Sequence, residues 1–243
     1  MIIKMPTQQD IPQMKLLWQQ TFGDSIKSID GFFATGYRQD RCRIVWDEKV
    51  LGAVYWFDLS WQGSRYGLIY ALAVEEAQRG KGLGSSLVDQ VCRDLQNQGY
   101  AGAVLAPAGE HLHIFYSRLG FTPFGGADTF LAEASGLPVY LEQVDVQTYL
   151  QDRPGFGWDD AFAAFVENQC LLYRVGDMRL IRYKDAEDIQ EYTGPMEKLP
   201  GILAGLGIKQ TRVRMQGAKQ PAGMCKRFNP DGDIPGYLGP IMD

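Results

Sequence analysis

Residues 70–97 join an apolar run to an amphipathic helix through a loop rich in glycine. The run 70–74 predicts a buried strand, and apolar residues at intervals of three and four over 83–95 predict a helix with one buried face. That helical stripe consists of Leu83, Leu87, Val88, Val91, Cys92 and Leu95. A strand that passes so quickly into a helix commits this part of the chain to a sheet covered by helices.

The loop between the strand and the helix has the composition of a phosphate-binding loop. Gly80, Gly82 and Gly84 lack a Cβ, so consecutive backbone N–H groups can point at one ligand. The helix that follows offers free amides and the positive end of its dipole at the same place. Arg79 and Lys81 add positive charge. We therefore expect a ligand that carries phosphate groups.

Two common phosphate-binding motifs do not fit this loop. A Walker loop requires Gly-Lys followed by Ser or Thr, but Lys81 is followed by Gly82, and Glu75 stands where the leading glycine belongs. A dinucleotide fingerprint requires a third Gly or Ala where Ser85 stands, and no acidic residue follows at the end of a second parallel strand.

The pattern that fits is R-x-x-G-x-G, formed by Arg79, Gly82 and Gly84 after the strand end L-A-V. Downstream, residues 115–121 read F-Y-S-R-L-G-F and end a short predicted helix. Together, and in this order, the two motifs resemble the GNAT superfamily of acyl-CoA N-acyltransferases, and the resemblance covers about 2–124.

The resemblance implies acetyl-CoA as co-substrate and requires no metal. In that superfamily the loop holds the coenzyme A pyrophosphate through backbone amides, and the preceding strand end binds the pantetheine arm. The matching cofactor-binding positions are Leu72, Ala73, Val74, Arg79, Gly80, Lys81, Gly82, Leu83, Gly84 and Ser85. The alternative is a glycine-rich helix start that binds no ligand.

The resemblance also assigns a catalytic role to Tyr116, whose hydroxyl would protonate the departing thiolate of coenzyme A. The amine would attack the thioester directly, without a covalent enzyme intermediate. Cys92, the obvious alternative nucleophile, lies on the apolar stripe of the predicted helix, so we expect it to be buried and inert. The alternative role for Tyr116 is packing in the core.

The sequence does not identify the general base. Leu68 occupies the position where some relatives carry a catalytic Glu, and Gly109 the position where many carry an Asn that contacts the cofactor. Nearby candidates for the base are Glu75, Glu76, Glu110, His111 and His113. Because some members of the superfamily use a C-terminal carboxylate, Asp243 is a further hypothesis. Aromatic residues that could line an acceptor pocket are Tyr55, Phe57 and Tyr66.

Periodicity predicts an α+β (α/β) fold in two parts. The pattern predicts a helix-flanked mixed sheet over residues 1–135, which the resemblance implies is a GNAT-type, mostly antiparallel sheet, and a linker over 136–158. Residues 159–243 are expected to form a smaller α+β domain. Its expected elements are a helix at 159–169, strands near 170–175, 178–184, 189–193, 211–215 and 224–228, and a helix near 196–206. This order makes a degenerate GNAT-like half conceivable.

Composition and charge narrow the class of protein. A net charge of -5 argues against a broad nucleic-acid surface. The cysteines, Cys42, Cys92, Cys170 and Cys225, form no C-x-x-C pair, which argues against a zinc site or a disulfide framework. We find no signal peptide and no apolar stretch long enough to span a membrane, and therefore expect a cytoplasmic protein without a membrane partner.

These observations favour an N-acetyltransferase that acts on a primary amine of a small molecule or a protein. Two other functions remain open: a non-catalytic acyl-CoA sensor, and a second half that serves as an interaction module. A homodimer is also compatible with the sequence, and basic positions of the second half, such as Arg212 and Arg214, could face an anionic ligand or simply water.

Overall fold

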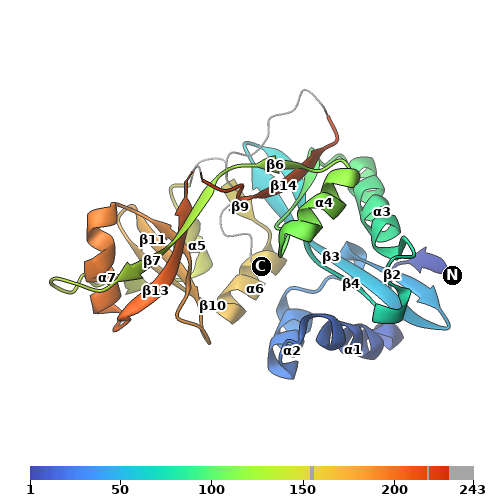
Figure 1. The fold of residues 1–243 in the computed structure, drawn as a ribbon, viewed down its shortest axis with the longest axis horizontal. Helices are drawn as coiled ribbons and strands as arrows, with labels where there is room; N and C mark the ends of the chain where they lie inside the picture. Colours follow the sequence, from blue (N-terminus) through green and yellow to red (C-terminus); the bar gives the residue numbers. More distant parts are fainter. Residues whose placement is uncertain (154–155, 218, 230–243) are drawn as a thin grey trace.

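The computed structural model describes residues 1–153, 156–217 and 219–229. Two β-sheets lie at opposite ends of an elongated molecule, each with helices packed against it (Figure 1). The expected α+β fold is confirmed. Asp243 lies outside the described residues. No helix in the described parts of the chain is long and apolar enough to cross a membrane.

The first sheet is mixed and contains most strands of the N-terminal half. Its order is β1-β2-β3-β4-β5-β14-β6, and β9 pairs with the end of β3. The strands are β1 (Ile2–Lys4), β2 (Cys42–Asp47), β3 (Lys49–Trp61), β4 (Ser64–Val74), β5 (Gly102–Leu105), β6 (Thr122–Phe124), β9 (Phe156–Trp158) and β14 (Gly223–Arg227). Only β4 and β5 run parallel to each other; the other neighbours are antiparallel.

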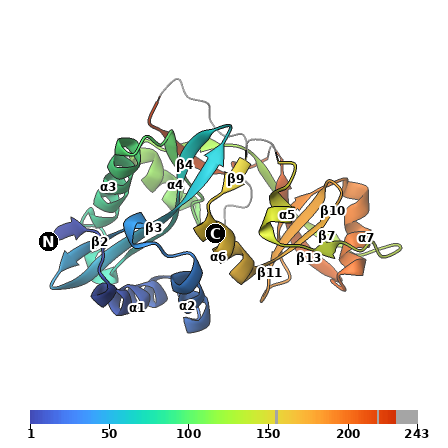
Figure 2. The same ribbon diagram turned by 180° about the vertical axis from the view of Figure 1, so that it is seen from behind.

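Helices cover both faces of the first sheet (Figure 2). On one face α1 (Ile11–Phe22) and α2 (Ile26–Thr35) pack with α6 (Asp160–Gln169) around an aromatic core. On the other face lie α3 (Leu83–Asn97) and α4 (Glu110–Arg118). The helix stripe predicted from the sequence is confirmed, because all six of its residues are buried in this second core.

The second sheet has the order β7-β13-β12-β11-β10-β8. Its strands are β7 (Ala127–Glu133), β8 (Glu142–Gln143), β10 (Cys170–Val175), β11 (Met178–Tyr183), β12 (Ile189–Thr193) and β13 (Gln210–Gln216). Helix α7 (Leu199–Gly205) packs against one face, and α5 (Val146–Leu150) with α6 packs against the other. The strands expected over 170–215 therefore form close to their predicted bounds.

The two sheets repeat one another in strand order and direction. In the first, β1 to β4 pair antiparallel, β5 is parallel to β4 after helix α3, and β14 is antiparallel to β5. In the second, β8 and β10 to β12 pair antiparallel, β13 is parallel to β12 after α7, and β7 is antiparallel to β13. The second half thus has the topology of the first.

The halves exchange their outer strands. Strand β7 follows β6 along the chain but joins the second sheet, whereas β14 follows β13 along the chain but inserts between β5 and β6 of the first sheet (Figure 1). Strand membership therefore does not follow the expected boundary near residue 135. The stretch 136–158, expected to be a linker, contains β8, α5 and β9. These elements have only two to five residues each, too few for a clear periodicity.

Close approach of β14 to β5 depends on Gly102. A Cβ at this position would lie only 2.7 Å from the carbonyl oxygen of Lys226 in β14. We expect Gly102→Val to push the strands apart and lower the free energy of unfolding by about 1–3 kcal/mol, as overpacking does. Urea unfolding measures this change. An unchanged midpoint would show that β14 does not depend on this contact.

Candidate active site

Strand β4 separates from its parallel neighbour halfway along its length. Pairing joins 66–68 of β4 to 102–104 of β5 and stops there. Strand β4 nevertheless continues to Val74 beside β3. Within the described residues, no strand pairs with 69–74 on the β5 side. An unpaired edge of this kind offers backbone N–H and C=O groups to an extended ligand.

A β-bulge lies at the point of separation. The register of β3 and β4 shifts between Tyr55 and Trp56, which pair with Ala71 and Ile69, so Tyr70 is the extra residue. As a result, Tyr70 and Ala71 both belong to the core beneath α1 and α2. Bulges re-aim side chains and occur next to active sites.

The predicted cofactor-binding strand end, Leu72, Ala73 and Val74, follows the bulge. Leu72 and Val74 belong to the core on the α3 face, whereas Ala73 is buried on the opposite face. Their backbone lies on the unpaired edge of β4. The structure therefore brings this segment directly to the start of the glycine-rich loop.

The loop adopts the backbone conformation that its glycines permit. Gly80 and Gly82 have φ of 77° and 81°, in the left-handed region that other residues avoid. Gly82 is the N-cap of α3, and no side chain caps the helix there. The first-turn amides of Leu83, Gly84 and Ser85 therefore have no side-chain cap at this N-terminus, which suits an anion.

Two basic residues flank these amides. The Nε of Arg79 donates a hydrogen bond to the carbonyl oxygen of Val74 at 3.2 Å, which ties the loop to the end of β4. The Nζ of Lys81 donates to Oε1 of Gln78 at 3.0 Å. Both side chains are exposed at the loop and add positive charge to the helix N-terminus.

Gly84, in the first turn of α3, lies close to α4. A Cβ at Gly84 would meet the ring of Phe115 at 3.6 Å and the side chains of Leu72 and Val74 at 3.7 and 3.8 Å. The first turn of α3, the end of β4 and α4 thus converge at one place. Family resemblance predicted that the two motifs form one site. In the structure the first turn of α3 lies close to α4, because a Cβ added at Gly84 would contact the ring of Phe115.

Tyr116 lies in α4 with only 7% of its surface exposed. Its ring makes edge contacts with Phe115 and Phe121, at centroid distances of 4.9 and 5.7 Å. Burial raises the pKa of Tyr116 to about 12, because the phenolate would lose its hydration. The hydroxyl therefore stays protonated at neutral pH, as a proton donor must.

The candidate bases have mixed environments. Lys49 forms an ion pair with Glu75. Glu110 and His111 are exposed at the first turn of α4, and the His111 ring lies beside Gly109. Leu68, which stands where some relatives carry a catalytic Glu, is fully buried.

All four cysteines are free and buried, as expected. Burial raises the pKa of the Cys92 thiol to about 11, so it is a poor nucleophile at neutral pH. In the described part of the chain, no cluster of three His, Cys, Asp or Glu residues could hold a metal ion.

A cavity of about 330 Å³ opens on the face of the first sheet that α1, α2 and α6 cover, next to the bulge at Tyr70. Its lining includes residues from α1, α2, β4, α6 and the segment after β11. They are Trp18, Asp24, Ser28, Phe32, Tyr70, Phe165, Gln169, Tyr183, Asp185 and Ala186. The cavity therefore lies where the two halves of the chain meet.

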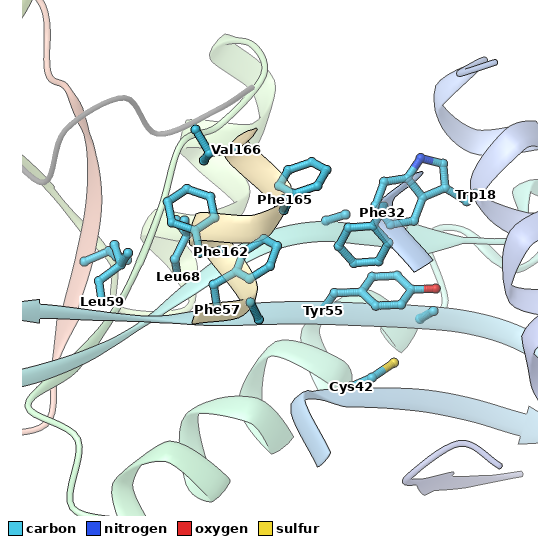
Figure 3. Close-up of a cluster of buried hydrophobic side chains, with 14 of the residues drawn as sticks. Trp18, Phe32, Cys42, Tyr55, Phe57, Leu59, Leu68, Phe162, Phe165 and Val166 are labelled. Atoms are coloured by element: carbon cyan, nitrogen blue, oxygen red, sulfur yellow. The ribbon is translucent and has the colours of Figure 1, made fainter. Parts of the chain in front are cut away.

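The aromatic residues expected at an acceptor pocket are not the ones that line this cavity. Tyr55, Phe57 and Tyr66 have at most 2% exposure and belong to the core. Figure 3 shows Tyr55 and Phe57 among the packed side chains of this core. Phe165 and Tyr183, from the second half, take their place in the lining. Strand alternation places a residue on a face of a sheet, but only the packed helices decide whether that face is open.

Comparison with known proteins identifies a matching family for the first half of the chain. Residues 11–121 match the family model described as Acetyltransferase (GNAT) family. No curated protein matches the sequence.

Solved structures resemble the whole chain rather than its first half alone. A GCN5-related N-acetyltransferase from Anabaena variabilis has a TM-score of 0.69 at 16% identity, over 94% of this chain and 73% of that one. A putative acetyltransferase from Pyrococcus horikoshii has a TM-score of 0.67 at 14% identity, over 99% and 94%. One from Kribbella flavida, also GCN5-related, has 0.66 at 16%, over 93% and 71%. At these identities the likeness establishes the fold alone.

Burial of Tyr116 predicts a specific loss of stability in alkali. The unfolded tyrosine ionises near pH 10 and the folded one near 12, so its contribution is complete below pH 10 and is lost as the pH rises to 12. Tyr116→Phe removes this loss. We expect the natural protein to lose up to about 1.4 kcal/mol per pH unit relative to the variant over this interval.

Urea unfolding of both proteins at several pH values from 9 to 12 measures this difference, because all other ionisations are common to both. A difference in stability that stays constant with pH would contradict the burial of the Tyr116 hydroxyl.

Proposed function

Residues 11–121 of this chain belong to the acetyltransferase (GNAT) family, and on that premise we propose that the protein transfers an acetyl group from acetyl-CoA to a primary amine. The observation that carries the proposal is the unpaired edge of β4 beside the uncapped N-terminus of α3. The unpaired strand edge suits an extended arm that contains amides, and the helix N-terminus suits a pyrophosphate. Coenzyme A contains both groups.

The binding mode follows from this arrangement. The pyrophosphate lies against the backbone amides of 79–85, which the left-handed Gly80 and Gly82 leave unobstructed. The pantetheine arm pairs with the backbone of Leu72 to Val74 as an added strand would. Its thioester then reaches the bulge at Tyr70, where β4 and β5 have separated.

The chemistry is direct transfer. The neutral amine forms an N–C bond to the thioester carbonyl, and a backbone amide near 72–74 stabilises the oxyanion. The C–S bond then breaks, and the departing thiolate takes a proton from the hydroxyl of Tyr116. The phenolate regains a proton from the newly acetylated nitrogen, directly or through water. The ammonium proton of the acceptor leaves to a base, directly or through water. Glu75, Glu76, Glu110, His111, His113 and Asp243 remain hypotheses for that base.

The acceptor is a small-molecule amine or an amino group of a protein. A catalytically inactive acyl-CoA sensor is the second candidate. Leu68, at the position of a catalytic Glu in some relatives, is fully buried and cannot take a proton. Binding and turnover measurements separate the two functions, because a sensor binds acetyl-CoA without releasing free thiol to any amine.

Calorimetry with acetyl-CoA tests the loop. We expect the natural protein to bind and the Gly82→Glu, Gly84→Glu variant to lose detectable binding, because two carboxylates would repel the pyrophosphate and fill its space. Gly63→Glu is a matched control, since Gly63 has the same φ of 81° as Gly82 and a Cβ added there would meet nothing within 4 Å. Binding by the double variant, or none by the natural protein, would refute the assignment.

Turnover tests Tyr116. We expect Tyr116→Phe to lower kcat by roughly 10²-fold, as the loss of a general acid does, with acetyl-CoA affinity unchanged because the ring still packs against Phe121. Tyr192→Phe is the control. It removes another buried hydroxyl, which donates to the Pro195 carbonyl oxygen in the second half, and should leave kcat unchanged. Equal rates for all three proteins would exclude Tyr116 as the acid.

A further inference from the structure

The cavity beside the bulge has an aromatic floor and an acidic rim. Trp18, Phe32 and Phe165 are almost completely buried, and with Tyr70 they form the floor. Asp24 and Asp185 are exposed at the edge of the same cavity. Apolar walls below and carboxylates above suit a ligand with an aliphatic body and a positive charge.

Resting on the proposed function, we propose that this cavity binds the acceptor and selects a small diamine: one amino group reacts at the bulge while a second, cationic one is held at the rim by Asp24 and Asp185. The Trp18 indole contacts both Asp24 at the rim and Tyr70 at the bulge. Its Nε1 donates to Oδ2 of Asp24 at 2.7 Å, and its ring centroid lies 6.0 Å from that of Tyr70.

The reacting nitrogen belongs at the Tyr70 end. Tyr70 is the bulged residue at the separation of β4 and β5, and it lies in the floor of the cavity. An acceptor nitrogen there faces the position proposed for the thioester. A nitrogen at the rim is held by the exposed Asp24 and Asp185 rather than at Tyr70, so the rim carboxylates serve recognition rather than proton transfer.

The rings of the floor suit the spacer between the two nitrogens. Phe32 contacts Trp18 and Tyr70 at centroid distances of 4.6 and 5.7 Å, and Phe165 contacts Tyr70 at 5.2 Å. Methylene groups bury apolar area on these rings, and an ammonium near the indole gains a cation–π interaction. The volume of about 330 Å³ is at the small end of ligand pockets, which favours a short chain.

The charged residues in the described lining of the cavity, Asp24 and Asp185, are both acidic. None of the described residues that line the cavity is Lys or Arg. The neighbour of Asp185, Lys184, is directed elsewhere: its Nζ donates to the carbonyl oxygens of Glu167 and Asn168 at the end of α6. The two carboxylates therefore face the cavity without a Lys or Arg side chain in its described lining.

Paired substrates test the proposal. Butylamine and 1,4-diaminobutane have the same chain and differ only in the second amino group. With acetyl-CoA and the natural protein, we expect the diamine to have the higher kcat/KM by about threefold to tenfold, the range of a partly exposed charge pair with a cation–π contribution.

Asp24→Asn and Asp185→Asn should each reduce this preference, through a higher KM for the diamine with kcat and the rate with butylamine unchanged. The amide oxygen that replaces the Asp24 carboxylate would still accept the hydrogen bond from Trp18, so this variant removes charge and keeps the contact. Asp40→Asn, an exposed aspartate outside the cavity, is the control. High salt should weaken the preference in the natural protein, because the rim is exposed.

The outcomes separate the two proposals. If butylamine and the diamine react equally, or if the preference survives both substitutions, the diamine inference is wrong and the acetyltransferase proposal stands. If no amine releases thiol from acetyl-CoA, the proposed function itself fails.

Discussion

The separation of β4 from β5 after Leu68 is the constraint on which both faces of the site depend. Had the parallel pairing continued, the backbone of 69–74 would be satisfied within the sheet. Because it stops, that edge is available on the side of α3 and α4. The bulge at Tyr70 also turns one additional side chain toward α1 and α2. The end of the β4–β5 pairing and the bulge beside it therefore shape both the proposed cofactor site and the proposed acceptor cavity.

The second half of the chain contributes to the acceptor side in a way that the first half alone could not. Helix α6 packs on α2 and supplies Phe165, the end of β11 supplies Tyr183, and the segment after β11 supplies Asp185. Strand exchange links the halves further, because β14 is hydrogen-bonded between β5 and β6. The elements of the proposed cofactor site thus come from one half, whereas residues of both halves line the proposed acceptor cavity.

The two halves share a topology, but the combination of features at the proposed phosphate site occurs only in the first half of the described chain. Between β4 and α3 the chain has left-handed glycines and a helix start without a side-chain cap. In the second half, Pro195 precedes α7 and Pro200 lies in its first turn, and neither has an N–H to donate. The second sheet instead buries an ionic group: Glu191 is fully buried and accepts hydrogen bonds from Tyr149 and Arg153. Such a network fixes structure rather than binding a ligand.

Local pattern determined much of this protein from its sequence. The glycine loop, the α3 stripe and the strands over 170–193 follow from spacing and periodicity, which act over a few residues. Tertiary structure decided the rest. Strands β7 and β14 take partners in the opposite sheet, and Asp24 and Asp185 meet at one cavity, because hydrogen bonding and packing between distant segments select these neighbours. No local pattern encodes which strand pairs with which or what a buried face meets, so these features could only be read from the folded chain.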